Sequence, residues 1–130
     1  MNDQTTDLID AIKFNDDGLV AAIAQQHDTG EVLMMAWMNK EAVTETVTKG
    51  RVCYFSRSRG KLWRKGESSN QVQKLIDFRI DCDGDTILLK VDQAGVACHT
   101  GRRDCFYRAW RDNEMITIAD VLIDPDKLYP

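Results

Sequence analysis

The stretch VQKLIDFRIDCDGDTILLKVD, residues 72–92, decides the fold because it holds two strand patterns around one acidic segment. Residues 72–81 and 86–92 are rich in the apolar and β-branched side chains that β-strands favour. The segment between them, DCDGD, has the composition of a strand end or a tight turn. The stretch therefore predicts two neighbouring strands joined by aspartates and one cysteine.

Similar strand patterns precede this stretch. Residues 19–26 and 31–38 are apolar and flank HDTG, in which Gly30 suits a positive backbone φ. Together they predict a β-hairpin. Residues 52–55, VCYF, predict a further strand.

Two helices are expected between and before these strands. Thr6 is expected to cap a short helix over 7–13, which has apolar side chains on one face. Asn39 is expected to cap a second helix over 40–48, which Gly50 would end. The fold class predicted for residues 1–130 is α+β. We expect a single β-rich domain with an antiparallel or mixed, barrel-like sheet and short covering helices.

Composition and charge exclude several classes of protein. With 130 residues, 43% hydrophobic and 29% charged, the chain has the composition of one ordinary globular domain. Its formal net charge of −4 argues against a general nucleic-acid binder. No signal peptide is evident, and the longest apolar run, 32–38, is too short to cross a membrane. We therefore expect a cytoplasmic protein whose four cysteines are free, metal-bound or catalytic.

A basic segment contrasts with this acidic balance. Residues 49–65 contain seven basic side chains and no acidic one. A solvated loop is the plain interpretation. The glycines, serine hydroxyls and arginines of SRSRGKLWRKGE also suit the phosphate groups of a small ligand. Trp63 could stack on a base there or pack in the core.

The DCDGD segment mixes ligands for two kinds of metal. Carboxylates suit Mg²⁺, whereas thiolates select zinc. If the segment is extended, Asp81, Asp83 and Asp85 face one way and Cys82 faces the other. A calcium loop is excluded because Thr86 stands where that loop needs glycine. A plain acidic hairpin turn remains the alternative.

A second motif, CHTGRRDC, spans residues 98–105. Cys82, Cys98 and Cys105 could supply three zinc ligands and leave the fourth position for water. His99 could act as the neighbouring general base, or could merely orient a cysteine. Cys53 is expected to be a buried free thiol, and His27 to lie on the surface.

SRSRGKLWRKGESS, DCDGD and CHTGRRDCFYR together resemble the phosphoribosyl-AMP cyclohydrolases of histidine biosynthesis. The resemblance implies Mg²⁺ at Asp81, Asp83 and Asp85. It implies zinc at Cys82, Cys98 and Cys105, with the ligands shared between the subunits of an intertwined homodimer and Cys82 coming from the partner. His99 matches the histidine to which the family assigns a catalytic role.

The resemblance also implies a phosphorylated nucleotide substrate and a stand-alone enzyme. Water activated by zinc is expected to add at C6 of the adenine ring of phosphoribosyl-AMP, after which the N1–C6 bond breaks. Asn70 departs from the family's usual glycine, but Asn tolerates left-handed backbone best after Gly. The expected substrate contacts are Ser56, Arg57, Ser58, Arg59, Trp63, Arg64, Lys65 and Glu67.

Two other functions remain open at this point. A zinc nucleobase deaminase would activate water similarly, but its H-x-E and P-C-x-x-C elements are absent from the sequence. A noncatalytic, zinc-stabilised nucleotide-binding module would instead have a closed four-ligand site.

Overall fold

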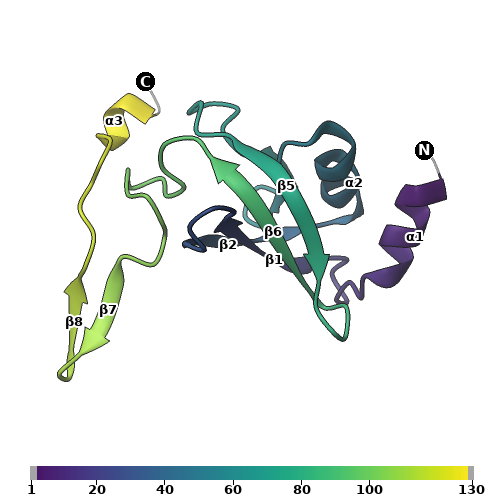
Figure 1. Cartoon of the computed structure of the whole chain (residues 1–130), viewed down its shortest axis with the longest axis horizontal. Coiled ribbons are helices and arrows are strands. Elements are labelled where there is room, and N and C mark those ends of the chain that lie inside the picture. Colours follow the sequence, from purple (N-terminus) through teal and green to yellow (C-terminus); the bar gives the residue numbers. More distant parts are fainter. Residues whose placement is uncertain (1–2, 129–130) are drawn as a thin grey trace.

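The computed structural model describes residues 3–128 and contains a curled, mixed six-stranded sheet (Figure 1). The strand order across this sheet is β4-β3-β2-β1-β6-β5. Its strands are β1 (Val20–Gln26), β2 (Val32–Met38), β3 (Cys53–Ser56), β4 (Lys61–Arg64), β5 (Gln73–Ile80) and β6 (Thr86–Gln93). The remaining elements are α1 (Asp3–Ala11), α2 (Lys40–Lys49), β7 (Arg108–Arg111), β8 (Glu114–Thr117) and α3 (Pro125–Leu128).

Three antiparallel hairpins and one parallel pair build the large sheet. β1–β2, β3–β4 and β5–β6 are antiparallel, whereas β1 and β6 run parallel at the centre. The predicted hairpins at 19–38 and 72–92 are confirmed, and Gly30 has a φ of 79°. The predicted α+β class with a mixed sheet and few short helices is confirmed as well.

Alternating side chains place the core on one face of the sheet. In β1 the burial alternates from Val20 to Gln26, and β6 alternates in the same way from Ile87 to Gln93. Cys53 is a buried free thiol, as predicted. Burial and the neighbouring Glu45 raise its pKa to about 12, which keeps the thiol protonated and unreactive.

The prediction for helix α2 is accurate, whereas that for helix α1 is only partly so. Asn39 caps α2 by accepting a 2.8 Å hydrogen bond from Ala42 N, and Gly50 ends the helix with a φ of 72°. Helix α1 begins earlier than predicted. Thr6 lies inside it, so the prediction that Thr6 is the cap was wrong.

Other local predictions also need correction. The basic segment is a β3–β4 hairpin, since residues 61–64 form a strand. Residues 82–85 form a turn, so the extended backbone considered for DCDGD does not occur. Asn70 has a φ of 64°, which agrees with the expectation that it adopts the left-handed conformation.

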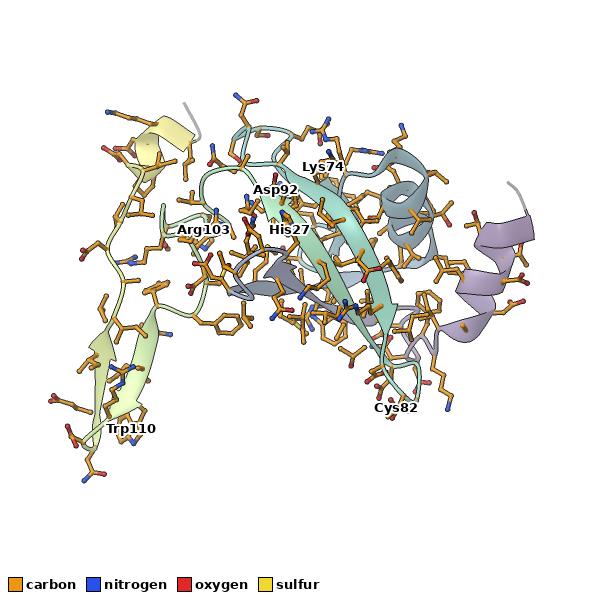
Figure 2. All side chains as sticks on the ribbon, viewed as in Figure 1. His27, Lys74, Cys82, Asp92, Arg103 and Trp110 are labelled. Atoms are coloured by element: carbon orange, nitrogen blue, oxygen red, sulfur yellow. The ribbon has the colours of Figure 1, made fainter. Side chains whose placement is uncertain are left out.

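The β7–β8 hairpin projects away from the large sheet as an arm (Figure 1). Trp110, at 66% exposure, lies on it (Figure 2). Met115, at 55%, lies on its second strand. This hairpin was not predicted from the sequence. No helix between residues 3 and 128 is long and apolar enough to span a membrane.

Candidate active site

One cavity collects most of the residues that the sequence singled out for substrate binding. Its volume is about 960 Å³, within the usual range of ligand pockets. Seven of the eight expected substrate contacts line it, and only Arg57 does not. His99 and Cys105 line the same cavity, although they are more than thirty residues away in sequence.

The β3–β4 hairpin forms one wall of this cavity. Its turn is closed by a 2.8 Å hydrogen bond from Gly60 N to Ser56 O, and the Ser56 and Ser58 hydroxyl oxygens lie 3.3 Å apart. Arg59 is exposed on the turn and has no ion pair among the described residues. The wall therefore offers hydroxyl and guanidinium donors to the space in front of it.

Two neighbouring arginines, Arg57 and Arg64, already have other partners in the structure. Arg64 donates two 2.8 Å hydrogen bonds to Glu45 of α2, and this pairing lowers the pKa of the Glu45 carboxyl. Arg57 lies on the other side of the hairpin, with its guanidinium 4.9 Å from the centroid of the Trp37 ring. Trp37 is half-buried there. The structure thus brings Arg59, but not Arg57, into the cavity.

Lys65 follows β4 and is only 3% exposed. Its Nζ lies 5.7 Å from the centroid of the Trp63 ring. Burial lowers the pKa of its amine, while the nearby Cys105 and Cys98 thiols act in the opposite direction. The sequence predicted Lys65 to be a substrate contact but did not predict its burial.

A short loop, residues 97–105, also lines the cavity and brings two thiols together. Ala97 N donates to Arg103 O at 2.9 Å and Cys98 N to Arg102 O at 3.2 Å, so the chain folds back on itself. Cys105 N then donates to Leu33 O of β2 at 2.8 Å. Burial, followed by the adjacent Cys98, raises the pKa of Cys105 to about 12. A bound divalent ion would displace the proton of this thiol.

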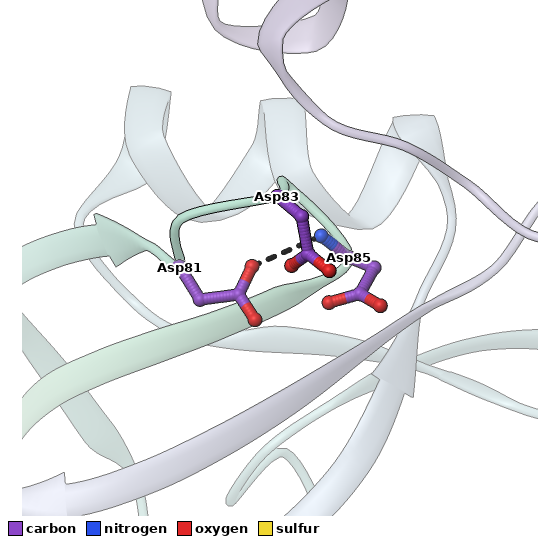
Figure 3. A group of neighbouring side chains, drawn as sticks. All are labelled: Asp81, Asp83 and Asp85. Atoms are coloured by element: carbon purple, nitrogen blue, oxygen red, sulfur yellow. Dashed lines mark hydrogen bonds between the residues drawn. The ribbon is translucent and has the colours of Figure 1, made fainter.

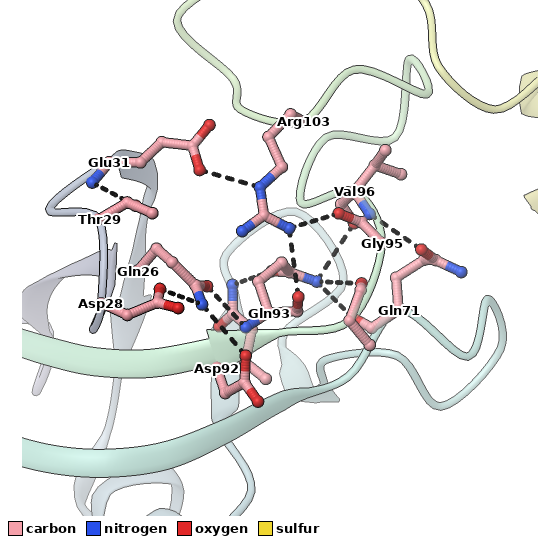
Figure 4. Close-up of polar contacts among 12 residues, drawn as sticks. Gln26, Asp28, Thr29, Glu31, Gln71, Asp92, Gln93, Gly95, Val96 and Arg103 are labelled. Carbon is pink, nitrogen blue, oxygen red and sulfur yellow. Dashed lines mark hydrogen bonds and ion pairs between the residues drawn. The ribbon is translucent and has the colours of Figure 1, made fainter.

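Buried glutamines fix this loop to the sheet (Figure 4). Gln93 Nε2 donates to the carbonyls of Ala94 at 2.8 Å and Gln71 at 3.1 Å. Gln73 Nε2 donates to Gln93 Oε1 at 2.8 Å and accepts, through its Oε1, a 2.7 Å bond from the Tyr54 hydroxyl. The network joins β3, β5 and β6 to the start of the thiol-bearing loop.

Arg103 ties the same loop to Glu31, the residue before β2. Its Nε donates to Glu31 Oε1 at 3.0 Å, and its Nη1 donates to Gly95 O at 2.6 Å (Figure 4). Arg103 and the glutamines were not predicted to be positioning residues. Arg103 lies within CHTGRRDC, but only the fold shows what its side chain and those of the glutamines bind.

The three aspartates of DCDGD converge at the β5–β6 turn (Figure 3). Their nearest carboxylate oxygens all lie within 4.8 Å of one another. Asp81 Oδ1 accepts hydrogen bonds from Asp85 N at 3.0 Å and Thr86 N at 3.2 Å, which hold its carboxylate in place. Hydrogen bonding to Asp83 and then Asp81 raises the pKa of Asp85. These oxygens form the kind of donor set that Mg²⁺ prefers.

Cys82 lies apart from the other two cysteines. It is exposed at the β5–β6 turn, at the far end of the sheet from Arg103 and the thiol-bearing loop (Figure 2). Among residues 3–128, the only group of three or more His, Cys, Asp or Glu with metal-ligand spacing is the aspartate trio. One chain therefore brings together two of the three expected zinc ligands, and His99 lies in the cavity beside them.

Comparison with known proteins gives one consistent family. The family model described as phosphoribosyl-AMP cyclohydrolase matches residues 34–107. A phosphoribosyl-AMP cyclohydrolase of Paramagnetospirillum magneticum is 74% identical over 91% of this chain and 89% of its own length. One of Granulibacter bethesdensis is 67% identical, over 95% of this chain and 98% of its own. The phosphoribosyl-AMP cyclohydrolase of Rhodospirillum centenum is 60% identical over 96% of this chain and 97% of its own length.

Proposed function

The chain belongs to the phosphoribosyl-AMP cyclohydrolase family, and we propose that it opens the adenine ring of phosphoribosyl-AMP by hydrolysis in histidine biosynthesis. Water adds at C6, the N1–C6 bond breaks, and N1 takes up a proton. C6 keeps its amino group and becomes a carboxamide carbon. The product is the phosphoribosyl-formimino aminoimidazole carboxamide ribotide.

The cavity supports this proposal most directly. Its volume of about 960 Å³ suits a nucleotide, and its lining combines donors for phosphate with groups that can take part in hydrolysis. Arg59 and the serine hydroxyls of the β3–β4 hairpin can hold phosphate, while Trp63 offers an aromatic face to the base. His99, on the thiol-bearing loop, can carry a proton between water and a ring nitrogen.

The paired thiols support a zinc centre. Cys98 and Cys105 would hold the ion, and zinc would polarise the water that reacts. Between residues 5 and 128, no third thiol joins them at metal-ligand spacing. We propose that a second copy supplies it through Cys82, which its own chain leaves exposed and distant from the other thiols.

The protruding arm supports a homodimer independently of the cysteines. An isolated two-stranded hairpin is marginally stable in water, and this one exposes Trp110 and Met115. A second chain packed against the arm would bury these side chains.

We propose Mg²⁺ at Asp81, Asp83 and Asp85, where it would bind phosphate or water. The predicted contacts of Arg57 and Arg64 with phosphate, and the cytoplasmic location, stay predictions.

The decisive experiment uses authentic phosphoribosyl-AMP and purified protein of known metal content. We expect the absorbance of the purine chromophore to change with turnover. Activity should fall when a chelator removes zinc and return when zinc is restored. A noncatalytic nucleotide-binding module would bind the same compound and leave the absorbance unchanged, which would refute the proposed activity.

A further inference from the structure

The loop of residues 65–69 lines the substrate cavity at the opposite end of β4 from the β3–β4 turn. Strand β4 has four residues, so about 10 Å separates its two ends. Lys61 pairs with Ser56 at the turn end, and Arg64 pairs with Cys53 at the loop end. The cavity therefore has two polar ends, and the proposed substrate has two phosphate groups, one on each of its ribose arms.

Lys65 begins this loop and is 3% exposed. Its backbone N–H donates to Val52 O at 3.1 Å, which fixes the residue beside β3. Its Nζ has no hydrogen bond and no ion pair in the described part of the chain. Every fully buried side-chain nitrogen or oxygen there has a hydrogen-bond partner, so the Nζ, which has none, reaches the open cavity. An ammonium group in this position needs an anion from the cavity, because burying an unpaired charge is costly.

The rest of the loop adds hydrogen-bond donors beside Lys65. Asn70 N donates to Gly66 O at 2.9 Å, which closes a tight turn, and the backbone N–H groups of Ser68 and Ser69 make no hydrogen bond within residues 3–128. The Ser69 hydroxyl oxygen accepts from the next N–H but one at 3.3 Å, so its proton is free for a ligand. Unpaired N–H groups in a turn, serine hydroxyls and an ammonium group together suit the oxygens of a phosphate.

Glu67 gives the same loop a second kind of group. It is the only carboxylate among the described residues that line the cavity, and its exposed side chain has no ion pair there. A carboxylate accepts hydrogen bonds and so suits the hydroxyls of a ribose. On each arm of the substrate, the ribose adjoins the phosphate. The loop thus offers groups for both parts of one phosphoribosyl arm.

We propose that the cavity has two separate phosphate sites, and that the 65–69 loop holds one phosphoribosyl arm while the β3–β4 turn holds the other. In the loop site, the phosphate binds Lys65 and the N–H and hydroxyl groups of Ser68 and Ser69, and the ribose hydroxyls bind Glu67. This inference rests on the function proposed above. It makes the enzyme selective for a nucleotide with two phosphorylated riboses over AMP, which has one.

The test compares matched substitutions at the two ends of the cavity in the full-length protein. Ser68→Ala and Ser58→Ala each remove one exposed hydroxyl, the first from the loop and the second from the turn. Lys65→Met and Arg59→Met each remove one charge in the same way. We expect the charge variants to raise KM for phosphoribosyl-AMP roughly 10- to 100-fold and the serine variants about tenfold, with kcat little changed. Lys74→Met, on the exposed face of β5 outside the cavity, should match the wild type.

Binding of AMP distinguishes two phosphate sites from one. AMP carries a single phosphate, so we expect it to occupy only one of the two sites. Isothermal titration calorimetry should show AMP binding weakened roughly tenfold or more in either Lys65→Met or Arg59→Met, and unchanged in the other. The two serine variants should follow the same division. Equal effects at both ends of the cavity, or no AMP binding by the wild type, would overturn the proposal.

Zinc content and thermal unfolding are measured on every variant. Because Ser68 is exposed, Ser68→Ala tests the loop site even if Lys65→Met does not fold. A wild-type KM in Ser68→Ala, or a folded Lys65→Met chain that loses zinc and keeps its affinity for substrate, would contradict the loop site. AMP binding requires no turnover. Absence of turnover in the wild type would therefore refute the proposed reaction, and the AMP comparison would still decide whether there are two phosphate sites.

Discussion

His99 has the freedom that a proton carrier needs. It is exposed in the cavity, and its imidazole makes no hydrogen bond to any group between residues 3 and 128. We predict that His99→Ala keeps its zinc and loses about 10²- to 10⁴-fold in kcat, the usual contribution of general acid–base catalysis. Metal content and turnover are measured on one preparation. His27→Ala, in the exposed β1–β2 turn, is the control, and full activity in His99→Ala would remove the assigned role.

Arg59 and Arg64 form a natural pair for testing phosphate binding. Both line the cavity, but Arg64 already has two hydrogen bonds to Glu45. We predict that Arg59→Met raises KM by about 10- to 100-fold, the value of a charge-assisted hydrogen bond. Arg64→Met should mainly lose a partly exposed ion pair worth at most about 1 kcal/mol of stability. Equal KM changes in the two variants would contradict this division.

Asp83 tests the proposed magnesium site. Its carboxylate converges with those of Asp81 and Asp85, so replacing it with an amide removes one charged oxygen ligand and keeps the shape. We predict that Asp83→Asn needs roughly tenfold more magnesium for half-maximal activity. Glu41→Gln, on the exposed face of α2, is the control. An unchanged magnesium titration would count against this ligand.

At the scale of the structural elements, substitutions at two glycines can distinguish the free-energy cost of backbone strain from that of overpacking. Gly60 and Gly101 both have positive φ, at 66° and 84°. A Cβ at Gly60 meets open space, whereas one at Gly101 would collide with the Ile123 carbonyl, where the C-terminal segment crosses the thiol-bearing loop. Leu122 N donates to Gly101 O at 2.8 Å in the same crossing.

We predict that Gly60→Ala lowers the free energy of unfolding by about 1 kcal/mol, the cost of a left-handed backbone. Gly101→Ala should lose roughly 2–5 kcal/mol, because overpacking adds to that strain. Gly101→Ala should also weaken zinc binding, because the thiol-bearing loop must move to make room for the added Cβ. Urea unfolding and zinc titration provide the measurements. Similar losses of stability in the two variants would contradict the packing argument.

Helices and strands that are specified by neighbouring residues were predictable from the sequence. Features that depend on pairing with strands distant in the sequence were not. The cap at Asn39, the left-handed Gly30 and the paired strands of 72–92 all follow from neighbouring residues. The parallel pairing of β1 with β6 joins strands about 65 residues apart, so no short pattern encodes it. Strand β4 was missed because its four residues, Lys61–Arg64, include two basic ones and carry little apolar signal.

At the scale of the whole molecule, the sequence identified candidate ligands but could not specify which of them meet. Cys98 and Cys105 come together through a loop held by Gln93 and Arg103, neither of which stands out in the sequence. Cys82 stays at the other end of the sheet (Figure 2). A site that needs all three sulfurs therefore needs two chains, and the exposed arm gives the second chain a surface to bury.

This requirement can be tested by complementation between two inactive variants. Cys82→Ser lacks the donated thiol, and Cys98→Ser lacks a thiol of the receiving pair, so each variant alone should bind little zinc at this centre. In a mixed dimer, one centre combines Cys98 and Cys105 of the first variant with Cys82 of the second. The other centre receives both substitutions.

Co-expression should therefore restore activity through intact centres in mixed dimers. Random assembly makes about half of the dimers mixed, and each mixed dimer has one intact centre of two. We predict about one quarter of the wild-type activity and zinc content, measured against each variant expressed alone. If all three sulfurs came from one chain, every chain would carry a damaged centre, and co-expression would restore nothing. Recovery of activity thus distinguishes a centre shared between chains from one built within a single chain.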